Sequence, residues 1–345
     1  MSKKILLWIG EEKRHPIKRD RNFDLVMDSV INYYNDEAPR LPYNAGKLFL
    51  DNGAYTANMQ GLTLDVDRVI FVQETLDPTQ TIPLDYPFKA GMSASQMMKL
   101  WEKTANNILY WQSSTTLTGL VPPLHAWDKD SLIKNLLWLR KHADAEYLAL
   151  GSVVNSNFSN FRGFFGDRQP TRELIDMISL SLESIREHTD FKVHLMGFGS
   201  SPLMLHIGYY LGIDSTDSSG YRRKAAYGKI ILPGTGERYV GNTSAKFGRL
   251  SLSPEELEVL RSCECPVCKL NQDLLWSDWK ARAIHNEYVI KQERRKAQAL
   301  LELGLETYET YLDKIFEKSS LKFLWEYTKL RRKYHRISHV LFGKR

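Results

Sequence analysis

Lys47-Leu48-Phe49-Leu50-Asp51-Asn52-Gly53 is a short apolar run that ends in an acid and a glycine. A run of this length, bounded by turn residues, is typical of a buried strand. Five more runs share this character: KILLWIG (4–10), RVIFVQE (68–74), TLTGLVP (116–122), EYLALGSVV (146–154) and FKVHLMGFG (191–199). Amphipathic stretches predict helices at about 93–112, 128–143, 170–189 and 200–211. This alternation predicts an α/β protein with a parallel sheet, and it suits a TIM-type (β/α)8 barrel better than an open doubly wound sheet.

All three cysteines of the chain lie in one stretch, SCECPVC at 262–268. An odd number of crowded cysteines cannot form a disulfide framework, whereas thiolates spaced Cys-x-Cys-x-x-Cys can converge on one tetrahedral Zn²⁺. We expect Cys263, Cys265 and Cys268 as ligands, with His285 returned to them by a helical segment as the fourth. Four protein ligands leave no open position, so the predicted zinc is structural. The alternative is three buried apolar cysteines and a surface histidine.

Length and composition indicate one large α/β domain with a smaller appendage, because 345 residues with 43% hydrophobic content can bury a large core. We expect a catalytic barrel over 1–255, a zinc-binding subdomain over 256–290 and a basic C-terminal helical extension over 291–345. No apolar run approaches the roughly 18 residues of a membrane span, and the apolar N-terminal stretch is too short for a secretory signal. These features predict a cytoplasmic protein without a membrane partner.

The net charge of +6 is concentrated at the C-terminus, where residues 329–345 hold seven Lys or Arg and no acid. A basic tail that also carries Tyr and His suggests contact with a nucleic acid backbone. A solvated helical face is the alternative.

Four aspartates follow or end apolar runs, the positions where the chemistry of a (β/α)8 barrel is found: Asp51, Asp85, Asp214 and Asp217. Any one of them could simply cap the helix that follows. Together they suggest two carboxylates that face a common pocket. Such a pair can break a bond to a sugar anomeric carbon, with one acid as nucleophile and the other exchanging protons.

The strings LFLDNGAYT, YLALGSVV, HLMGFGSP, LGIDSTDSSGYRRKAAYG and CECPVC with IHN resemble, in the same order, the motifs of the tRNA-guanine transglycosylase superfamily. Members of that superfamily exchange guanine for a 7-deazapurine. The resemblance covers roughly residues 45–290, and the zinc knuckle combined with GID-x-x-D is its most diagnostic part. It implies that Asp217 is the nucleophile and that Asp51 exchanges a proton with the base. It also implies that the three cysteines and His285 are zinc ligands.

The same resemblance assigns the base-binding residues. Tyr55 and Met196 would cover the two faces of the base, with ordinary core packing as the alternative for each. Asp85 would read the guanine edge, with Gly151 and Gly197 at backbone positions beside it. Because a guanine inside a duplex cannot reach such a pocket, we expect an extruded or unpaired nucleotide.

Further contacts with the nucleic acid are expected from two segments. Arg222, Arg223 and Lys224 follow the nucleophile turn and could hold flanking phosphates. The Phe-rich stretch NSNFSNFRGFFGDRQ (155–169) could wedge or stack against bases, or pack as a lid.

Departures from the superfamily's motifs indicate to which of its subfamilies the chain is most similar. The chain has Asn52-Gly53-Ala54-Tyr55 where the superfamily has S-G-G-F. Pro122 stands near a base-contacting glutamine of the tRNA enzymes, which leaves His125 as the nearest polar substitute. No added RNA-binding domain is visible. The chain is therefore most similar to the DpdA-type transglycosylases, which insert 7-deazaguanines such as 7-cyano-7-deazaguanine into DNA. The alternatives are a tRNA-acting enzyme, a hydrolase that removes the base, and a catalytically dead nucleic-acid-binding homologue.

Overall fold

The computed structural model describes residues 4–13, 17, 21–89, 91–151, 172–240 and 252–342, with side chains described as far as residue 333. The chain divides into two compact units. The first combines Met1–Ile9 with Gly197–Arg345, and the second is the continuous segment Gly10–Met196.

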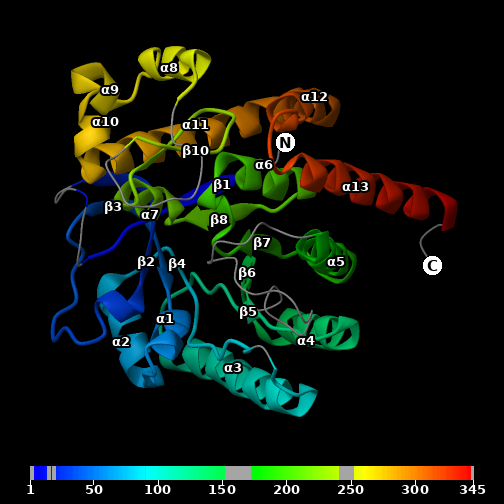
Figure 1. Cartoon of the computed structure of the whole chain (residues 1–345). Coiled ribbons are helices and arrows are strands. Elements are labelled where there is room, and N and C mark those ends of the chain that lie inside the picture. The colour runs from blue at the N-terminus through cyan, green and yellow to red at the C-terminus, as the bar shows by residue number, and fades with distance from the viewer. Residues whose placement is uncertain are drawn as a thin grey trace. The chain divides into compact units, whose positions relative to one another are not determined.

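Parallel strands alternate with helices along the described chain, as Figure 1 shows by label and colour. The strands are β1 (Leu6–Gly10), β2 (Asn22–Ser29), β3 (Asn44–Asp51), β4 (Gln80–Thr81), β5 (Pro123–Leu124), β6 (Tyr147–Leu150), β7 (Lys192–Leu195) and β8 (Ser215–Ser218). In the continuous unit, β2, β3 and β4 pair in that order, as do β5, β6 and β7. A parallel bridge between Thr81 and Leu120 joins the two sets. In the other unit the first and last strands, β1 and β8, pair in parallel. The predicted TIM-type α/β class is confirmed.

Helices follow the strands in both units. In the continuous unit they are α1 (Ala54–Met59), α2 (Val66–Leu76), α3 (Ala94–Ser114), α4 (Lys129–His142) and α5 (Arg172–His188), with the 3-10 turn η1 (Val30–Asn32). In the other unit they are η3 (Phe198–Ser200), α6 (Pro202–Leu211), α7 (Gly220–Ala226), α8 (Pro254–Arg261), α9 (Pro266–Asn271), α10 (Leu274–Ser277), α11 (Trp279–Leu303), α12 (Leu305–Phe316) and α13 (Lys322–Phe342). The helices predicted near 93–112, 128–143 and 200–211 are confirmed, as is the third from Arg172 onward; residues 170 and 171 lie outside the described residues.

The predicted strand RVIFVQE is wrong, because these residues form the middle of α2. The Asp65 side chain accepts a hydrogen bond from the Arg68 amide at 2.9 Å, which caps the helix. Val69, Ile70, Val72 and Gln73 are buried, a spacing that suits one helical face. The strand predicted for the run TLTGLVP ends at Pro122, whereas β5 begins at the next residue, Pro123.

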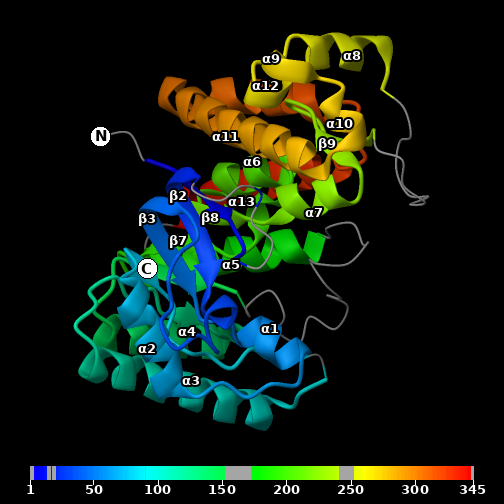
Figure 2. The same cartoon turned by 90° about the vertical axis from the view of Figure 1, so that its left-hand side faces the viewer.

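Polar side chains of α11, two of them buried and one half-buried, organise the unit that contains β1 and β8. Arg282 donates to the Ala225 carbonyl of α7 at 2.8 Å. The Asn286 amide bonds the Tyr221 carbonyl of α7 at 3.1 Å. Gln298 accepts from the Ile5 amide, just before β1, at 2.8 Å. Figure 2 shows α11 as the long helix of this unit, with α9 and α10 beside it.

Glu293 is the most enclosed acid of α11. Its carboxylate lies 2.8 Å from His206 Nε2 on α6, and it accepts from the Gly234 amide and the Tyr311 hydroxyl, both at 3.1 Å. Burial raises the pKa of Glu293, but the contacts with His206, Lys296 and Tyr311 outweigh it and leave the pKa below its ordinary value. Glu293 therefore serves as a charged acceptor that ties α6, α11 and α12 together.

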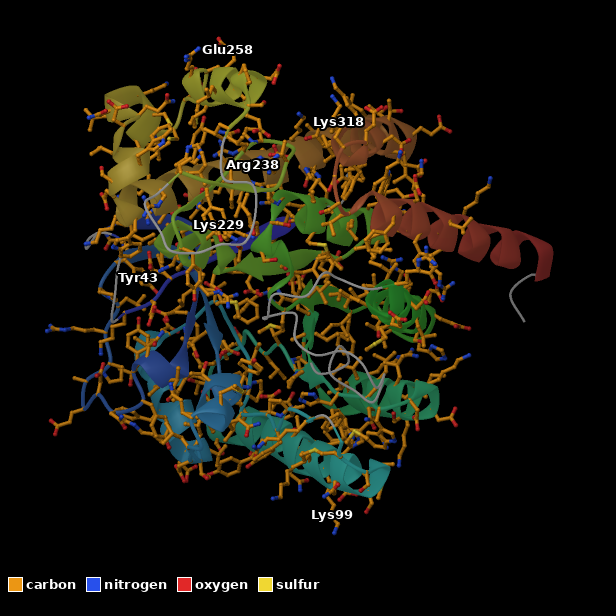
Figure 3. The ribbon with its side chains drawn as sticks, viewed as in Figure 1. Tyr43, Lys99, Lys229, Arg238, Glu258 and Lys318 are labelled. Carbon is orange, nitrogen blue, oxygen red and sulfur yellow. The ribbon has the colours of Figure 1, made fainter. Side chains whose placement is uncertain are left out.

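A short antiparallel hairpin, β9 (Lys229–Ile231) with β10 (Glu237–Tyr239), completes this unit. Lys229 and Arg238, labelled in Figure 3, come from its two strands. Arg238 pairs with Glu256 of α8 at 2.7 Å, and Lys229 pairs with Glu237 at 3.2 Å. The hairpin is thus tied by charge within itself and to α8.

The C-terminal helices predicted beyond residue 290 are present as the rest of α11, α12 and α13. Trp325 fixes α13 to α12, since its indole donates to Asp313 at 2.7 Å and its ring stacks on Phe316 at 5.6 Å. The basic segment from 329 continues α13 as far as Phe342. Within the described residues, none of the helices has the length and apolar character required to cross a bilayer.

Candidate active site

Asp51 ends β3 and lies opposite Ser29, the last residue of β2, in the parallel register. One oxygen of its carboxylate, Oδ2, accepts hydrogen bonds from the Ser29 hydroxyl and from the Gly53 amide, both at 3.1 Å. The side chain is half-buried. The carboxyl end of β3 therefore presents an acid whose orientation is set by its neighbours, at the end of the strand where (β/α)8 proteins carry their chemistry.

Gly53 makes the turn from β3 into α1. Its φ is +79°, the left-handed region that favours glycine. A Cβ at this position would lie 2.9 Å from Ile31 Cβ and 3.0 Å from the Ile31 amide nitrogen. The tight turn brings Tyr55 onto the first turn of α1, where its side chain is 47% exposed. An exposed aromatic beside a strand-end acid suits the predicted stacking role.

Asp85 is held between two polar side chains. The buried Asn52 donates through Nδ2 to Asp85 Oδ1 at 3.0 Å and to the Pro83 carbonyl at 2.6 Å. His125 Nε2 lies 2.8 Å from Asp85 Oδ2. The imidazole is 1% exposed, and neither ring nitrogen has an aligned hydrogen bond in the described part of the chain. The structure thus brings together Asp85 and His125, which sequence motifs placed far apart.

The backbone around Asp85 is anchored from α2 and α3. Gln73 donates to the Ile82 carbonyl at 2.8 Å, and Asn107 donates to the Leu84 carbonyl at 2.9 Å. The Tyr86 amide donates to the Thr104 hydroxyl at 3.1 Å. These buried or part-buried contacts pair the backbone groups of an irregular segment after β4, and they fix the position of Asp85.

Gly151 and Met196 follow the adjacent strands β6 and β7. The Met196 amide donates to the Leu150 carbonyl at 3.2 Å, which extends the parallel pairing by one step. A Cβ on Gly151 would lie 3.7 Å from Met196 Cγ, so the thioether side chain lies beside the bare glycine backbone. The Phe-rich stretch 155–169 lies outside the described residues.

Asp217 lies on β8, opposite Trp8 of β1. Its Oδ1 accepts a 2.5 Å hydrogen bond from the amide of Gly197, which has a φ of +68°. Asp214 instead precedes β8, where its carbonyl accepts from the Leu6 amide at 2.9 Å. The expectation that Asp214 lies at the carboxyl end of a strand is therefore wrong.

The three cations after Asp217 differ in exposure. Arg222 is buried, and loss of solvation lowers its pKa to about 10 despite the charge of Glu287. Lys224 lies 2.6 Å from Glu237 and donates to the Ser200 carbonyl at 2.8 Å. Arg223 is exposed on α7. Of the three, Arg223 is the side chain best placed to meet a partner from solvent.

Cys263, Cys265, Cys268 and His285 come together as predicted. Their candidate ligand atoms all lie within 4.8 Å of one another, and the three sulfurs are 3.6, 3.5 and 3.5 Å from His285 Nδ1. His285 Nε2 lies 3.0 Å from the Ile231 carbonyl. With its proton on Nε2 for that contact, the ring presents Nδ1 to the sulfurs; histidines that bind metals commonly donate their other ring N–H to a carbonyl in this way. These residues could hold a metal ion.

The described residues thus combine acids on parallel strands of an α/β fold with a Cys₃His cluster that could hold a metal ion. A family model described as queuine tRNA-ribosyltransferase matches residues 54–320. The chain belongs to this family, and hence to the transglycosylases of the tRNA-guanine transglycosylase superfamily. No curated protein matches the chain significantly.

Gly53 offers a test of how tightly the Asp51 turn is built, with Gly61 as a matched control. Both have positive φ, +79° and +69°, but a Cβ on Gly61 would meet nothing within 4 Å. We expect Gly61→Ala to cost about 1 kcal/mol of unfolding free energy from backbone strain alone. Gly53→Ala should cost roughly 1–3 kcal/mol more, because Ile31 must move. Urea unfolding measures both, and equal costs would show that Ile31 yields freely.

Proposed function

We propose that the protein exchanges guanine in DNA for a 7-deazaguanine base, such as 7-cyano-7-deazaguanine, through a covalent Asp217–glycosyl intermediate. Family membership over residues 54–320 is the observation that carries this proposal. Half-buried Asp51 and Asp217, each held by hydrogen bonds on its strand, support an intact catalytic pair rather than a retired site.

In the proposed reaction, Asp217 attacks the anomeric carbon of a guanosine nucleotide and forms a glycosyl ester as guanine leaves. Asp51 supplies the proton that makes guanine a better leaving group. The 7-deazapurine then enters, loses a proton to Asp51 and attacks the anomeric carbon from the face that guanine left, which breaks the bond to Asp217 and frees its carboxylate. Two inversions give net retention of configuration. The hydrogen bond from the Gly197 amide supports this role, because it orients the Asp217 carboxylate before reaction.

The base-binding part of the proposal uses residues of the continuous unit. Asp85 accepts from the N1–H and 2-amino groups of guanine, and His125 contributes to this recognition. Tyr55 and Met196 cover the faces of the extruded base, and Gly151 leaves its backbone open to it. The exposure of Tyr55 and the position of Met196 beside Gly151 support these roles.

DNA as the acceptor is proposed from the sequence departures and from charge. Just before and at the start of β5 the chain has Pro122-Pro123, with Pro122 near the glutamine of the Gln-Gly pair that contacts the base in the tRNA enzymes. The basic helix α13 could follow a phosphate backbone through charge, and exposed Arg223 could hold a flanking phosphate. The family's description favours tRNA as the alternative acceptor.

We further propose that the Cys₃His cluster binds structural Zn²⁺. Tetrahedral zinc with Zn–S of about 2.3 Å and Zn–N of about 2.0–2.1 Å requires sulfur-to-nitrogen distances of about 3.6 Å. The observed distances from His285 Nδ1, 3.5 to 3.6 Å, meet that requirement. A bound ion would complete the thiolate coordination and hold α9 against α11, with no position left for substrate.

Zinc content and stability test this assignment. Protein purified without chelator should contain about one zinc per chain, as four ligands around one ion require. Cys268→Ser should lose the metal and lower the melting temperature, because the remaining thiols stay crowded without a counter-charge. Ser262→Ala, in the same segment but without a ligand role, is the control. Zinc-free wild-type protein that melts at the same temperature as a zinc-loaded sample would refute the site.

Adduct trapping tests the nucleophile. Wild-type protein incubated with guanine-containing DNA should form a protein–DNA complex that survives denaturation, because the ester is covalent. Asp217→Asn should abolish this complex on a denaturing gel. Asp214→Asn, three residues away at the start of β8, should retain it. An Asp217→Asn adduct of wild-type yield would remove Asp217 from the mechanism.

Competition between acceptors tests the choice of nucleic acid. Duplex DNA, single-stranded DNA and bulk tRNA are offered together with one labelled 7-deazapurine, and the nucleosides are separated by mass. We expect label in deoxynucleosides, because the base-contacting pair typical of tRNA enzymes is absent. Label found only as a ribonucleoside would overturn the DNA assignment and leave the Asp51 and Asp217 mechanism standing. Alkali-sensitive strand breaks would instead indicate a hydrolase, and absence of any exchange a binding protein.

A further inference from the structure

We propose that His125 and Asn52 are positioning residues that clamp Asp85, and that selectivity for a purine with a 2-amino group depends on this clamp. The inference rests on the proposed function and deepens its base-recognition step. It is carried by the placement of Asn52 Nδ2 and His125 Nε2 on different oxygens of the same carboxylate, at 3.0 and 2.8 Å.

An aspartate carboxylate turns easily, because its terminal torsion is broad and roughly two-fold. Each carboxylate oxygen has two acceptor sites. Asn52 lies at one site of Asp85 Oδ1, and His125 lies at one site of Asp85 Oδ2. With Asn52 bound to one oxygen and His125 Nε2 beside the other, the two remaining sites can face two parallel N–H donors, which is the pattern of the guanine N1–H and 2-amino edge. A base with one such donor gains much less from the fixed orientation.

Each arm of the clamp is itself fixed by the fold. His125 is buried against Phe88 and Trp101, with ring centroids 5.2 and 6.4 Å away, and its carbonyl accepts from Asn135 at 2.8 Å. Asn52 is 2% exposed, and its Oδ1 accepts from the Ala54 amide at 2.8 Å at the start of α1. Packing and backbone contacts therefore determine where the two donors point.

The imidazole also retains hydrogen-bonding capacity that its surroundings do not use. Neither ring nitrogen has an aligned partner in the described part of the chain, although both are buried. Buried polar atoms are nearly always paired, so an exception calls for a functional reason. A small rotation toward Asp85 when a base binds would align the Nε2 contact and tighten the clamp.

The preference for guanine over hypoxanthine tests whether the clamp orients Asp85. With whichever nucleic acid the acceptor competition identifies, the KM for labelled guanine and the inhibition constant of hypoxanthine, which lacks the 2-amino group, are compared across variants. His125→Phe keeps an aromatic ring between Phe88 and Trp101 but removes the donor. We expect its KM for guanine to rise about 10- to 100-fold, the loss of one hydrogen bond to a charged group. Because this is a binding contact, kcat should change little. The preference for guanine over hypoxanthine should fall about tenfold.

Rescue and control variants separate positioning from folding. His125→Gln places an amide nitrogen near the position of Nε2 and should restore most of the preference. Asn52→Ser keeps a cap for α1 but loses the contact with Asp85, so it should shift selectivity in the same direction as His125→Phe even where that variant fails to fold. His142→Phe replaces a histidine that stacks on Trp138, far from this contact in sequence, and should leave the preference unchanged.

Two failures are distinguishable. If the wild-type protein exchanges no guanine in any nucleic acid, the proposed function falls, and the clamp falls with it. If the wild type exchanges guanine while His125→Phe and Asn52→Ser keep its preference for guanine over hypoxanthine, the clamp alone is overturned. Equal loss of activity toward both bases in a folded variant would likewise assign His125 to packing.

Discussion

Helix α11 satisfies the requirement that polar groups in a protein core be paired. Arg282 and Asn286 bond carbonyls of α7, Glu293 bonds α6, and Gln298 bonds the backbone before β1. Each contact is made from a different turn of one continuous helix, so α6, α7 and the backbone before β1 are all held by the same helix. A buried group left without its partner costs about 1–3 kcal/mol, which makes these contacts mutually dependent. Because β8 pairs with β1, the position of the strand that carries Asp217 depends on these contacts.

Acids in both units are oriented by neutral donors. Asp51 receives a hydroxyl and a backbone amide, Asp85 an amide side chain, and Asp217 a glycine amide. Such donors fix the direction in which a carboxylate points. In the proposed mechanism this direction matters most at Asp51, which must release and recover a proton within one cycle. The glycines at 53 and 197 allow the close backbone approach that makes these donors available.

Local sequence patterns predicted the parts of the fold that depend on local physics. The zinc-ligand motif spans 23 residues, and its cysteines and His285 meet as expected because a helical segment covers the interval. RVIFVQE misled because its β-branched content outweighed the Asp65 cap and the helical spacing of its buried residues. Strand β8, with the sequence STDS, has no apolar run, since small polar residues fill the interior beside β1. The contact between Asp85 and His125 joins two different loops, so no spacing rule could foresee it.

The unit that holds Asp217 is discontinuous, and this has a consequence for biosynthesis. Strand β1 pairs with β8, and the Ile5 amide bonds Gln298, so these residues acquire their partners only after the intervening segment has been synthesised. The intervening segment Gly10–Met196 is continuous and can begin to fold on its own contacts in the meantime. At synthesis rates of about 5–20 residues per second, β1 waits roughly 10–40 seconds for β8. During that interval the edge of β1 that β8 will cover is a natural client for a chaperone, and slowing translation beyond residue 196 would lengthen its exposure.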